Sequence, residues 1–204
     1  KIGAAGGKPV AITGEATRAR VHLLRAQCDA EMIGIGTARA DDPLLTCRLP
    51  GMAKRSPVRI VLDRALRLPG DGQLVHSARE VPLWVMTSDT AEAPAAAKLG
   101  AAGVQVLRVK TSEHGLDLAD ALRMLSDKGI TRLMVEGGAQ VAASFVEAGL
   151  VDEVWLLRGP NEIGADGVAA LGALPLGAIT QSPSFRVRAS EKLDHDTLTI
   201  YQRV

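Results

Sequence analysis

Short apolar runs alternate with amphipathic segments along most of this 204-residue chain, and this alternation restricts the fold more than any other feature. The apolar runs predict buried strands at residues 30–36, 58–62, 83–87, 104–109, 132–136 and 154–157. Helical periodicity predicts helices at residues 14–27, 92–102, 117–128 and 139–148. Strands that alternate with helices favour a three-layer α/β fold, in which helices cover both faces of a mostly parallel central sheet.

The last third of the chain has a different pattern. Residues 159–184 are rich in Gly and Pro and are expected to wrap an edge of the sheet. Residues 185–193 and 197–204 have strand patterns on either side of the short turn 194–196, which predicts a closing antiparallel strand pair. Because no repeat, low-complexity tract or linker divides the sequence, we expect a single domain over residues 1–204.

Composition argues against several classes of partner. The formal net charge is +1 and only 2% of residues are aromatic, so neither a basic face nor a stacking platform for nucleic acid is expected. The two cysteines, Cys28 and Cys47, form no CxxC motif, which favours a reducing compartment. No apolar run is long enough to span a membrane. We therefore expect a cytoplasmic enzyme without a nucleic-acid or membrane partner.

Several familiar site signatures are incomplete in this sequence. A GxGxxG motif would begin at Gly34, but Arg39 stands where its third glycine is required. The P-loop-like stretch at residues 3–8 is one residue short, and Pro9 replaces the hydroxyl residue that binds magnesium. The four histidines lack metal-ligand spacing, and HExxH, GxSxG and the zinc-deaminase signature are absent. We therefore predict no metal site.

Glu136, Gly137 and Gly138 stand where a predicted strand ends and a predicted helix begins. Two glycines allow another molecule to approach the backbone closely, and the free N–H groups of a helix start favour an anion such as a pyrophosphate. Ligands of open α/β sheets bind beyond the carboxyl ends of the strands, which is the place of Glu136. Taken alone, the motif favours the alternative, in which the two glycines make a tight turn and Glu136 caps the helix.

A second candidate segment spans residues 36–48, GTARADDPLLTCR. Thr37 is suited to hydrogen-bond a ligand, Asp41 and Asp42 precede Pro43 in a stiff acidic turn, and Arg48 suits a phosphate group. The alternative is an ordinary Asp-Pro turn with a solvated arginine. Arg25 at the end of the first predicted helix has a similar alternative, because a cation there is stabilised by the helix dipole.

Together, these segments resemble the reductase domain of the bifunctional deaminase/reductase of riboflavin biosynthesis, which has a dihydrofolate-reductase-like fold. The similarity covers nearly the whole chain. The pieces that carry it are ITGEATRARVHLLRAQ (12–27), MIGIGTARADDPLLTCRLPG (32–51), VRIVLD (58–63), GITRLMVEGGAQVAASFVEAGLVDEV (129–154) and GPNEIGADG (159–167). The elements ADDPLLTCR and VEGGA, in this order, are the most specific.

The resemblance implies NADPH-dependent reduction of the ribosyl side chain of 5-amino-6-(5-phosphoribosylamino)uracil to its ribityl form. It implies a set of residues that contact NADPH: Thr37, Asp41, Gly138, Ala139, Gln140, Val141, Ala142, Ala143 and Ser144. It further implies that Arg25, Leu45 and Arg48 bind the phosphorylated substrate, with Glu136 beside the reacting sugar. Opening the sugar ring requires proton movement, for which Glu136 is the first catalytic candidate and Asp41 the second.

The sequence also departs from the family pattern. Residues 9–11 replace a Ser-x-Trp motif, Arg64 replaces a small hydroxyl residue that helps to hold the cofactor, and Asn161 replaces a lysine. The family's first strand and its deaminase domain would precede Lys1 and are absent from this sequence. Arg64 is suited to bind the 2′-phosphate of NADPH or to point to solvent.

Two alternative functions stay open on these residues. One is a sister reductase that acts on the 2,5-diamino-6-ribosylamino-pyrimidinone phosphate or on a pterin-like substrate. The other is a reductase-like domain kept for oligomerisation. For all of these functions we expect a homodimer, and the parent chain is expected to carry a fused N-terminal deaminase domain.

Overall fold

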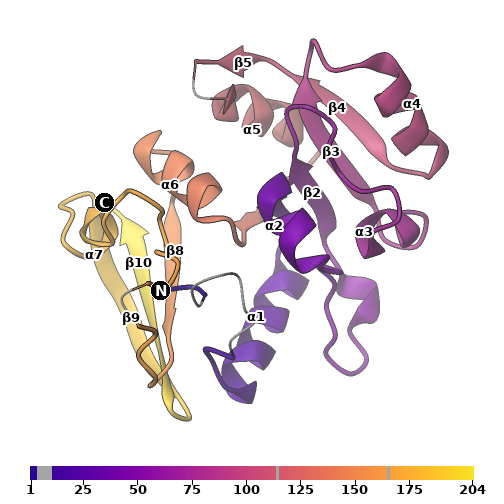
Figure 1. Cartoon of the computed structure of the whole chain (residues 1–204). Helices are drawn as coiled ribbons and strands as arrows, with labels where there is room; N and C mark the ends of the chain where they lie inside the picture. Colours follow the sequence, from indigo (N-terminus) through magenta and orange to yellow (C-terminus); the bar gives the residue numbers. More distant parts are fainter. Residues whose placement is uncertain (4–10, 114, 165) are drawn as a thin grey trace. The chain divides into compact units, whose positions relative to one another are not determined.

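The computed structural model describes residues 1–3, 11–113, 115–164 and 166–204. It divides into two compact units (Figure 1). The central unit comprises residues 22–138, and the terminal unit comprises residues 1–21 together with residues 139–204. Helix α1 (Glu15–Gln27) begins in the terminal unit and ends in the central unit.

The central unit is built on a five-stranded parallel sheet with the strand order β4-β3-β2-β1-β7. Its strands are β1 (Ala30–Gly34), β2 (Val58–Leu62), β3 (Leu83–Ser88), β4 (Gln105–Val109) and β7 (Leu133–Val135). The strands β1 to β3 carry nearly continuous apolar runs, as expected for parallel strands buried on both faces. The order reverses at β1, because β2 lies on one side of it and β7 on the other.

Side-chain alternation along the strands defines the two faces of this sheet. Ile33, Val61 and Val85 belong to a core cluster that also contains buried residues of α3 (Gln73–His76) and α4 (Ala93–Ala101). Trp84 has the opposite orientation along β3, and the ammonium of Lys128, which caps α5 (Leu118–Asp127), lies 5.5 Å from its ring centroid. The helix α5 therefore covers the other face, as right-handed connections require when the strand order reverses.

Shorter elements complete the central unit. They are α2 (Ile35–Asp41), a 3₁₀ turn η2 (Ala53–Arg55) and the small antiparallel pair β5 (Thr111–Ser112) and β6 (Gly115–Leu116). Ala38 of α2 packs in the same cluster as Ile33, so α2 lies on the face covered by α3 and α4.

The terminal unit contains a three-stranded antiparallel sheet with the order β8-β10-β9. Its elements are α6 (Ala139–Glu147), β8 (Glu153–Arg158), α7 (Gly177–Thr180), β9 (Phe185–Leu193) and β10 (Asp196–Arg203). Leu171, Ile179 and Tyr201 form its core, against which residues of α6 and β8 pack. Asp196 accepts hydrogen bonds from the Gly14 amide (2.7 Å) and the Thr17 hydroxyl (2.5 Å), so β10 holds the start of α1.

The predicted α/β class is confirmed: a parallel sheet lies between helices, and the strands at the C-terminus are antiparallel. Two predictions of detail were wrong. The strand predicted at 30–36 ends at Gly34, because residues 35–41 form α2. The strand predicted at 154–157 does not continue the parallel sheet, because β8 pairs with β10 in the separate antiparallel sheet.

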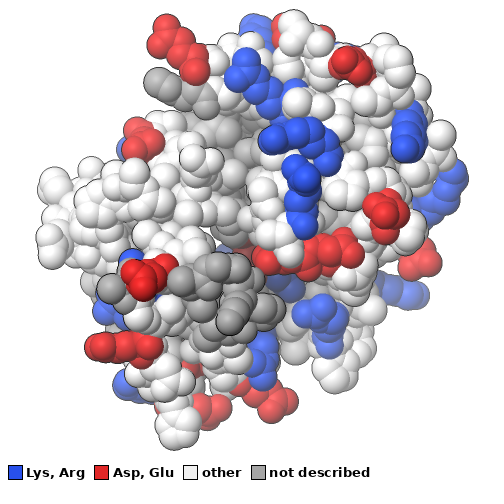
Figure 2. Space-filling model, in the orientation of Figure 1, with Lys and Arg blue, Asp and Glu red and all other residues white. Residues whose placement is uncertain are grey.

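Within the described residues, no helix combines the length and the apolar character needed to cross a membrane. Basic and acidic side chains both occur over the face seen in Figure 2, which agrees with the near-zero net charge of the sequence. Buried ionisable side chains are more informative than this surface. Arg25, Glu31, Arg59 and Asp63 are all buried in the central unit.

Candidate active site

The reversal of strand order at β1 locates a candidate site in the central unit. In open parallel sheets the connections after two such neighbouring strands diverge, which leaves a crevice at their carboxyl ends. Here β1 leads into α2, which carries Thr37, and β7 leads into Glu136, Gly137 and Gly138. The amide of Glu136 still donates to the Met32 carbonyl at 3.0 Å, so Glu136 is fixed directly beside β1.

Gly137 brings the two sequence segments together. Its φ of +93° and the φ of +82° at Gly138 lie in the left-handed region that L side chains rarely adopt. A Cβ atom on Gly137 would lie only 3.3 Å from Cγ2 of Thr37. The two glycines therefore allow the backbone after β7 to approach the start of α2 closely.

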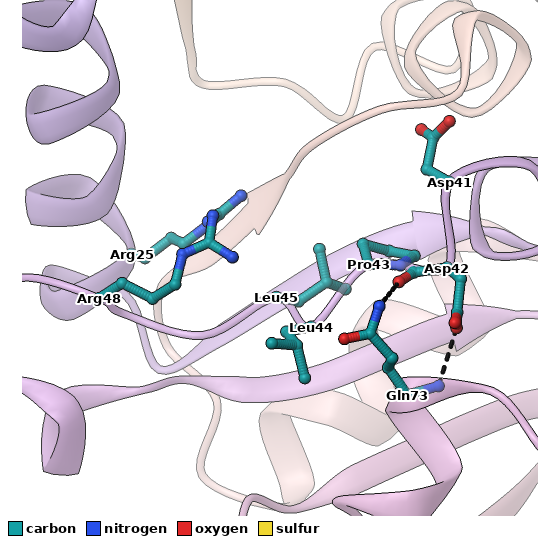
Figure 3. Close-up of a pocket in the computed structure, with 8 residues that line it drawn as sticks. All are labelled: Arg25, Asp41, Asp42, Pro43, Leu44, Leu45, Arg48 and Gln73. Atoms are coloured by element: carbon teal, nitrogen blue, oxygen red, sulfur yellow. Dashed lines mark hydrogen bonds between the residues drawn. The ribbon is translucent and has the colours of Figure 1, made fainter. Parts of the chain in front are cut away.

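A pocket of about 280 Å³ follows α2. Eight residues line it: Arg25, Asp41, Asp42, Pro43, Leu44, Leu45, Arg48 and Gln73. Figure 3 shows the guanidinium groups of Arg25 and Arg48 at one end of the group and the carboxylates of Asp41 and Asp42 at the other. The pocket thus offers two cations together with acceptor oxygens.

The loop that forms this pocket is held in a defined shape. Asp42 ends α2 at a φ of +39°, and the buried Leu45 has a φ of +52°. Such values are unusual for a leucine and persist only where the surroundings fix them. Gln73 supplies part of this constraint, because its backbone amide donates to the Asp42 carboxylate (2.8 Å) and its side chain donates to the Asp42 carbonyl (2.6 Å).

Arg59 of β2 also fixes the pocket loop. Its fully buried guanidinium donates to the Leu44 carbonyl at 3.2 Å and to the Ser77 hydroxyl at 2.7 Å. It also donates to the carbonyls of Ser77 and Val81. A buried cation that satisfies several carbonyl groups ties the pocket loop to β2 and to the segment after α3.

Arg25 lies between two glutamates. Its Nε donates to Oε1 of Glu31 at 3.0 Å and to Oε2 of Glu136 at 3.1 Å, and its Nη2 donates to Oε2 of Glu136 at 2.6 Å. Glu31 is completely buried, whereas 35% of the Glu136 side chain is exposed. The open end of this cluster is therefore Glu136, and its closed end is Glu31.

The pKa values of the two carboxyl groups are shifted in opposite directions by this arrangement. Burial and the adjacent Glu136 raise the pKa of Glu31 to about 9. For Glu136, burial opposes ionisation, but the hydrogen bonds of Glu31 and Arg25 and the positive charge of Arg25 hold its pKa below the ordinary value. Burial would by itself lower the pKa of Arg25, and the two glutamates raise it instead.

His22 connects Arg25 to the pocket loop. Its Nδ1 lies 3.4 Å from Nη1 of Arg25 and accepts a hydrogen bond of 3.4 Å from the Arg48 amide. Burial, Arg25 and Arg48 lower the pKa of His22, so the imidazole is neutral at pH 7. The acceptor on the ring then matches the Arg48 amide donor.

The sequence-predicted residues of the central unit meet in two groups. Arg25, Asp41, Leu45 and Arg48 line the pocket, and Glu136 is joined to it through Arg25. Thr37 lies against Gly137, next to Gly138. The predicted cofactor residues 139–144 begin α6 in the terminal unit, where Ala142 and Ala143 pack against its core.

Three residues of this site were not predicted: His22, Glu31 and Gln73. The sequence contains an indication for Glu31, because it is an acidic residue in the otherwise apolar run AEMIG. The sequence contains no such indication for His22 and Gln73, since their partners are remote in sequence. Stabilisation by the helix dipole does not by itself account for the position of Arg25, because its guanidinium bridges two carboxyl groups.

The departures from the family pattern have different outcomes. Pro9 and Val10 lie outside the described residues. Arg64 follows β2 with an exposed side chain, while its carbonyl accepts a hydrogen bond from the Thr87 hydroxyl at 3.0 Å. Over the described ranges, no group of three or more His, Cys, Asp or Glu residues could hold a metal ion.

Known proteins resemble this chain in both sequence and fold. The family model described as RibD C-terminal domain matches residues 1–199. The riboflavin biosynthesis protein RibD of Actinobacillus pleuropneumoniae is 34% identical over 203 residues, which are 98% of this chain and 53% of that protein. The 2,5-diamino-6-ribosylamino-4(3H)-pyrimidinone 5′-phosphate reductase of Methanothermobacter thermautotrophicus is 37% identical over 154 residues, which are 75% of this chain and 69% of that protein.

Solved structures agree with these similarities. A diaminohydroxyphosphoribosylaminopyrimidine deaminase/5-amino-6-(5-phosphoribosylamino)uracil reductase from Thermotoga maritima superposes with a TM-score of 0.78 at 26% identity. The match covers 100% of this chain and 53% of that one. This chain therefore spans about half the length of the RibD proteins that it matches.

Proposed function

We infer the function of this chain from one premise: it belongs to the family of RibD C-terminal domains. The resemblance seen in the ADDPLLTCR and VEGGA segments is thereby confirmed at the level of the family. Its relatives include reductases of riboflavin biosynthesis. Because this chain spans only about half of its RibD relatives, the reaction itself is a proposal.

We propose that the chain reduces the ribosyl side chain of 5-amino-6-(5-phosphoribosylamino)uracil to the ribityl form with NADPH. The observation that carries the proposal is the Glu136–Arg25 pair at the carboxyl end of β7, joined to the pocket of Arg48 and Asp41. It offers an ionised carboxylate beside cations suited to a phosphate group, at the place where this fold binds ligands.

The residues that we assign to NADPH fit such a cofactor on physical grounds. Gly137 and Gly138 adopt left-handed φ values and lead directly into α6, so their backbone can approach a pyrophosphate without a side chain in the way. Thr37, Asp41 and Gly138 are assigned to the cofactor, as are residues 139–144 at the start of α6. NADPH supplies the hydride, and the protein orients the reactants and excludes water.

The substrate is assigned to the pocket. The guanidinium of Arg48 would bind the phosphate, together with Arg25, and Leu45 would shape the wall between them. Arg25 is already held by Glu31 and Glu136, so its orientation toward the pocket costs little further ordering on binding.

Glu136 is the proposed catalytic residue for proton movement. Opening the ribosylamine ring to an imine transfers a proton from the nitrogen to the ring oxygen, and hydride addition at C1 then requires a proton on the nitrogen. A carboxylate beside C1 is suited to these transfers. Glu136 is partly exposed and held in its ionised form, whereas Asp41, the second candidate, lines the other end of the pocket.

The decisive experiment measures NADPH oxidation with the aminouracil phosphate as substrate. We expect turnover by the wild type and a raised melting temperature with NADPH, because ligands that bind the native state stabilise it. Glu136→Gln should lower kcat by about 100-fold or more and leave the Kd for NADPH within about twofold. Arg48→Met should raise KM by about 10-fold or more, since a charge-assisted contact contributes about 1.5–3 kcal/mol.

Two control variants match these changes. Glu113→Gln alters an exposed glutamate between β5 and β6, and Arg55→Met alters an exposed arginine of η2 that does not line the pocket. Both should behave as the wild type. The proposal fails if NADPH gives no thermal shift and the aminouracil phosphate gives no oxidation. A higher kcat/KM with the diamino-pyrimidinone phosphate would instead identify the sister activity.

We also propose a cytoplasmic homodimer that works beside a deaminase domain. The support for the deaminase is the name of the Thermotoga relative, which combines both activities over a chain about twice as long. Sedimentation of this chain with and without NADPH tests the dimer.

A further inference from the structure

Glu31 is a buried ionisable group that has no assigned role in the proposed reaction. It occupies the second position of β1, is inaccessible to solvent and does not line the pocket of Arg25 and Arg48. Its neighbours on β1 are apolar, and a glutamate in a strand that is buried on both faces is destabilising unless it is paired. Its contacts therefore need an explanation.

The geometry around Arg25 places two carboxyl groups on one donor. The single Nε–H of Arg25 faces Oε1 of Glu31 at 3.0 Å and Oε2 of Glu136 at 3.1 Å. One guanidinium carries one positive charge, so two ionised glutamates would leave a net negative charge in a largely buried cluster. Two carboxyl groups this close share a proton rather than both ionising.

The hydrogen-bond pattern identifies where the proton lies. Both oxygens of Glu31 lie 3.0 Å from Nε of Arg25, whose single hydrogen bonds to Oε1, so the buried Oε2 has no hydrogen-bond partner of its own. As a hydroxyl group, Glu31 can donate to the carboxylate of Glu136, because both carboxyl groups contact the same Nε–H of Arg25. Glu136 is the more exposed of the two and has the shorter contact with Arg25, so the negative charge is better solvated there.

The other charged and titratable groups around Glu31 cannot take the place of Glu136 as its hydrogen-bond partner. Arg59 is its neighbour in register on β2, but its guanidinium is bonded to the carbonyls of Leu44, Ser77 and Val81. His22 contacts Arg25 and Arg48. The Cys28 thiol, which follows α1, is buried and uncharged.

We propose that Glu31 is a positioning residue, whose protonated carboxyl group donates a hydrogen bond to Glu136 and accepts one from Arg25. This holds the catalytic carboxylate and the substrate-binding guanidinium in one fixed relative orientation. The proposal rests on the proposed function for its effect on turnover, but the location of the proton can be tested without substrate.

Two substitutions of similar size separate a neutral donor from a counter-ion. In Glu31→Gln, the amide still donates to Glu136 and its carbonyl still accepts from Arg25, so kcat should stay within about threefold of the wild type. In Glu31→Met, the apolar side chain does neither, and kcat should fall by about 30-fold or more. NADPH binding should change by less than about twofold in both variants, and Glu113→Gln serves as the matched control.

The pH profile distinguishes positioning from a merely structural role. In Glu31→Met, Glu136 loses a donor to its ionised form, so the acidic limb of kcat/KM should move to higher pH. In Glu31→Gln it should stay in place. The proposal is overturned if Glu31→Gln is as damaging as Glu31→Met, which would make Glu31 a charged counter-ion, or if folded Glu31→Met turns over normally.

Carbon-13 NMR of the chain labelled at glutamate carboxyl groups tests the proton directly. One resonance should be missing from Glu31→Gln, and in the wild type at pH 7 it should have the shift of a neutral acid. A carboxylate shift for that resonance overturns the proposal. If the wild type lacks turnover but the neutral resonance is present, the proposed reaction fails while the shared proton stands.

Discussion

Glu31, Arg25 and Glu136 link the chemistry of single residues to the stability of the central unit. Glu31 is neutral where it is buried, whereas in an unfolded chain it ionises near its ordinary pKa of 4.5. The folded protein therefore holds a proton that the unfolded protein releases between that value and a pKa of about 9. The contribution of Glu31 to stability is present in full below pH 4.5 and is lost as the pH rises through this window.

This linkage predicts how the free energy of unfolding depends on pH. The free energy of unfolding of the wild type, minus that of Glu31→Gln, should fall between pH 5 and pH 8. The fall should be at most about 1.4 kcal/mol per pH unit. Urea unfolding at several pH values measures it. His22 titrates in both proteins, so the subtraction removes its effect.

The control for this measurement is Glu113→Gln, whose difference from the wild type should not vary over the same range because its side chain is exposed. A wild-type advantage that grows with pH would contradict the neutral state of Glu31.

At the scale of residues, the sequence predicted two members of the cluster and missed the third, Glu31, which is completely buried. Arg25 and Glu136 were identified from motifs, although they are 111 residues apart. Glu31 occupies a strand position that periodicity assigns to the core, and no pattern indicates that a neutral glutamate fits there. Its role follows only from where Arg25 and Glu136 meet.

At the scale of elements, the connections that leave β1 and β7 determine the site. β2 was predicted with its observed bounds, because the run VRIVL is bounded by Pro57 and Asp63. α2 was missed because its first residues, Ile35 and Gly36, continue an apolar run that is typical of a strand. Helix and strand cannot be separated over so short an apolar run.

β8 shows a different limit of sequence reasoning. Its residues were predicted as a strand, but its partner was not, because an apolar run does not specify whether it pairs in parallel or antiparallel fashion. The partner β10 lies about 40 residues further along the chain, and only the folded unit brings the two together.

The close approach of Gly137 to Thr37 predicts the result of a single substitution. Gly137→Ala forces a side chain onto a φ of +93° and against Cγ2 of Thr37, so it should destabilise the protein by about 1–2 kcal/mol. It should also weaken NADPH binding by about 10-fold, because the backbone after β7 must move away from its position. Thermal melting and titration with NADPH measure the two effects.

Gly100→Ala is the matched control for this change. Gly100 lies in α4 with open space around its Cα and no left-handed φ, so alanine there should be neutral or stabilising by up to about 1 kcal/mol. Equal behaviour of the two variants would show that the backbone at Gly137 is not constrained.

At the scale of the whole molecule, each compact unit has its own hydrophobic core and one tryptophan. Trp84 on β3 reports on the central unit, and Trp155 on β8 reports on the terminal unit, where its Nε1 donates to Glu153 at 2.6 Å. Substituting either one by phenylalanine leaves a single reporter. The unfolding of the two units can therefore be followed separately.

Asp196 is the residue that tests whether they unfold separately. Its carboxylate binds the Gly14 amide and the Thr17 hydroxyl, contacts that span about 180 residues of sequence and lie entirely within the terminal unit. Both donors bind the same oxygen, Oδ2. In Asp196→Asn, a neutral amide oxygen replaces the charged one and accepts both hydrogen bonds more weakly, which should destabilise that unit by about 1–3 kcal/mol. Asp194→Asn, in the adjacent exposed turn at a φ of +55°, is the control, because asparagine tolerates this conformation.

Urea unfolding of these variants should give different midpoints for the two reporters. Asp196→Asn should lower the midpoint seen by Trp155 and leave the midpoint seen by Trp84 close to that of Asp194→Asn, because local contacts of one unit do not stabilise the core of the other. Equal shifts at both tryptophans would instead mean that the chain unfolds as one cooperative body. In that case, a substitution in the terminal unit would weaken the Glu31–Arg25–Glu136 cluster through global stability alone.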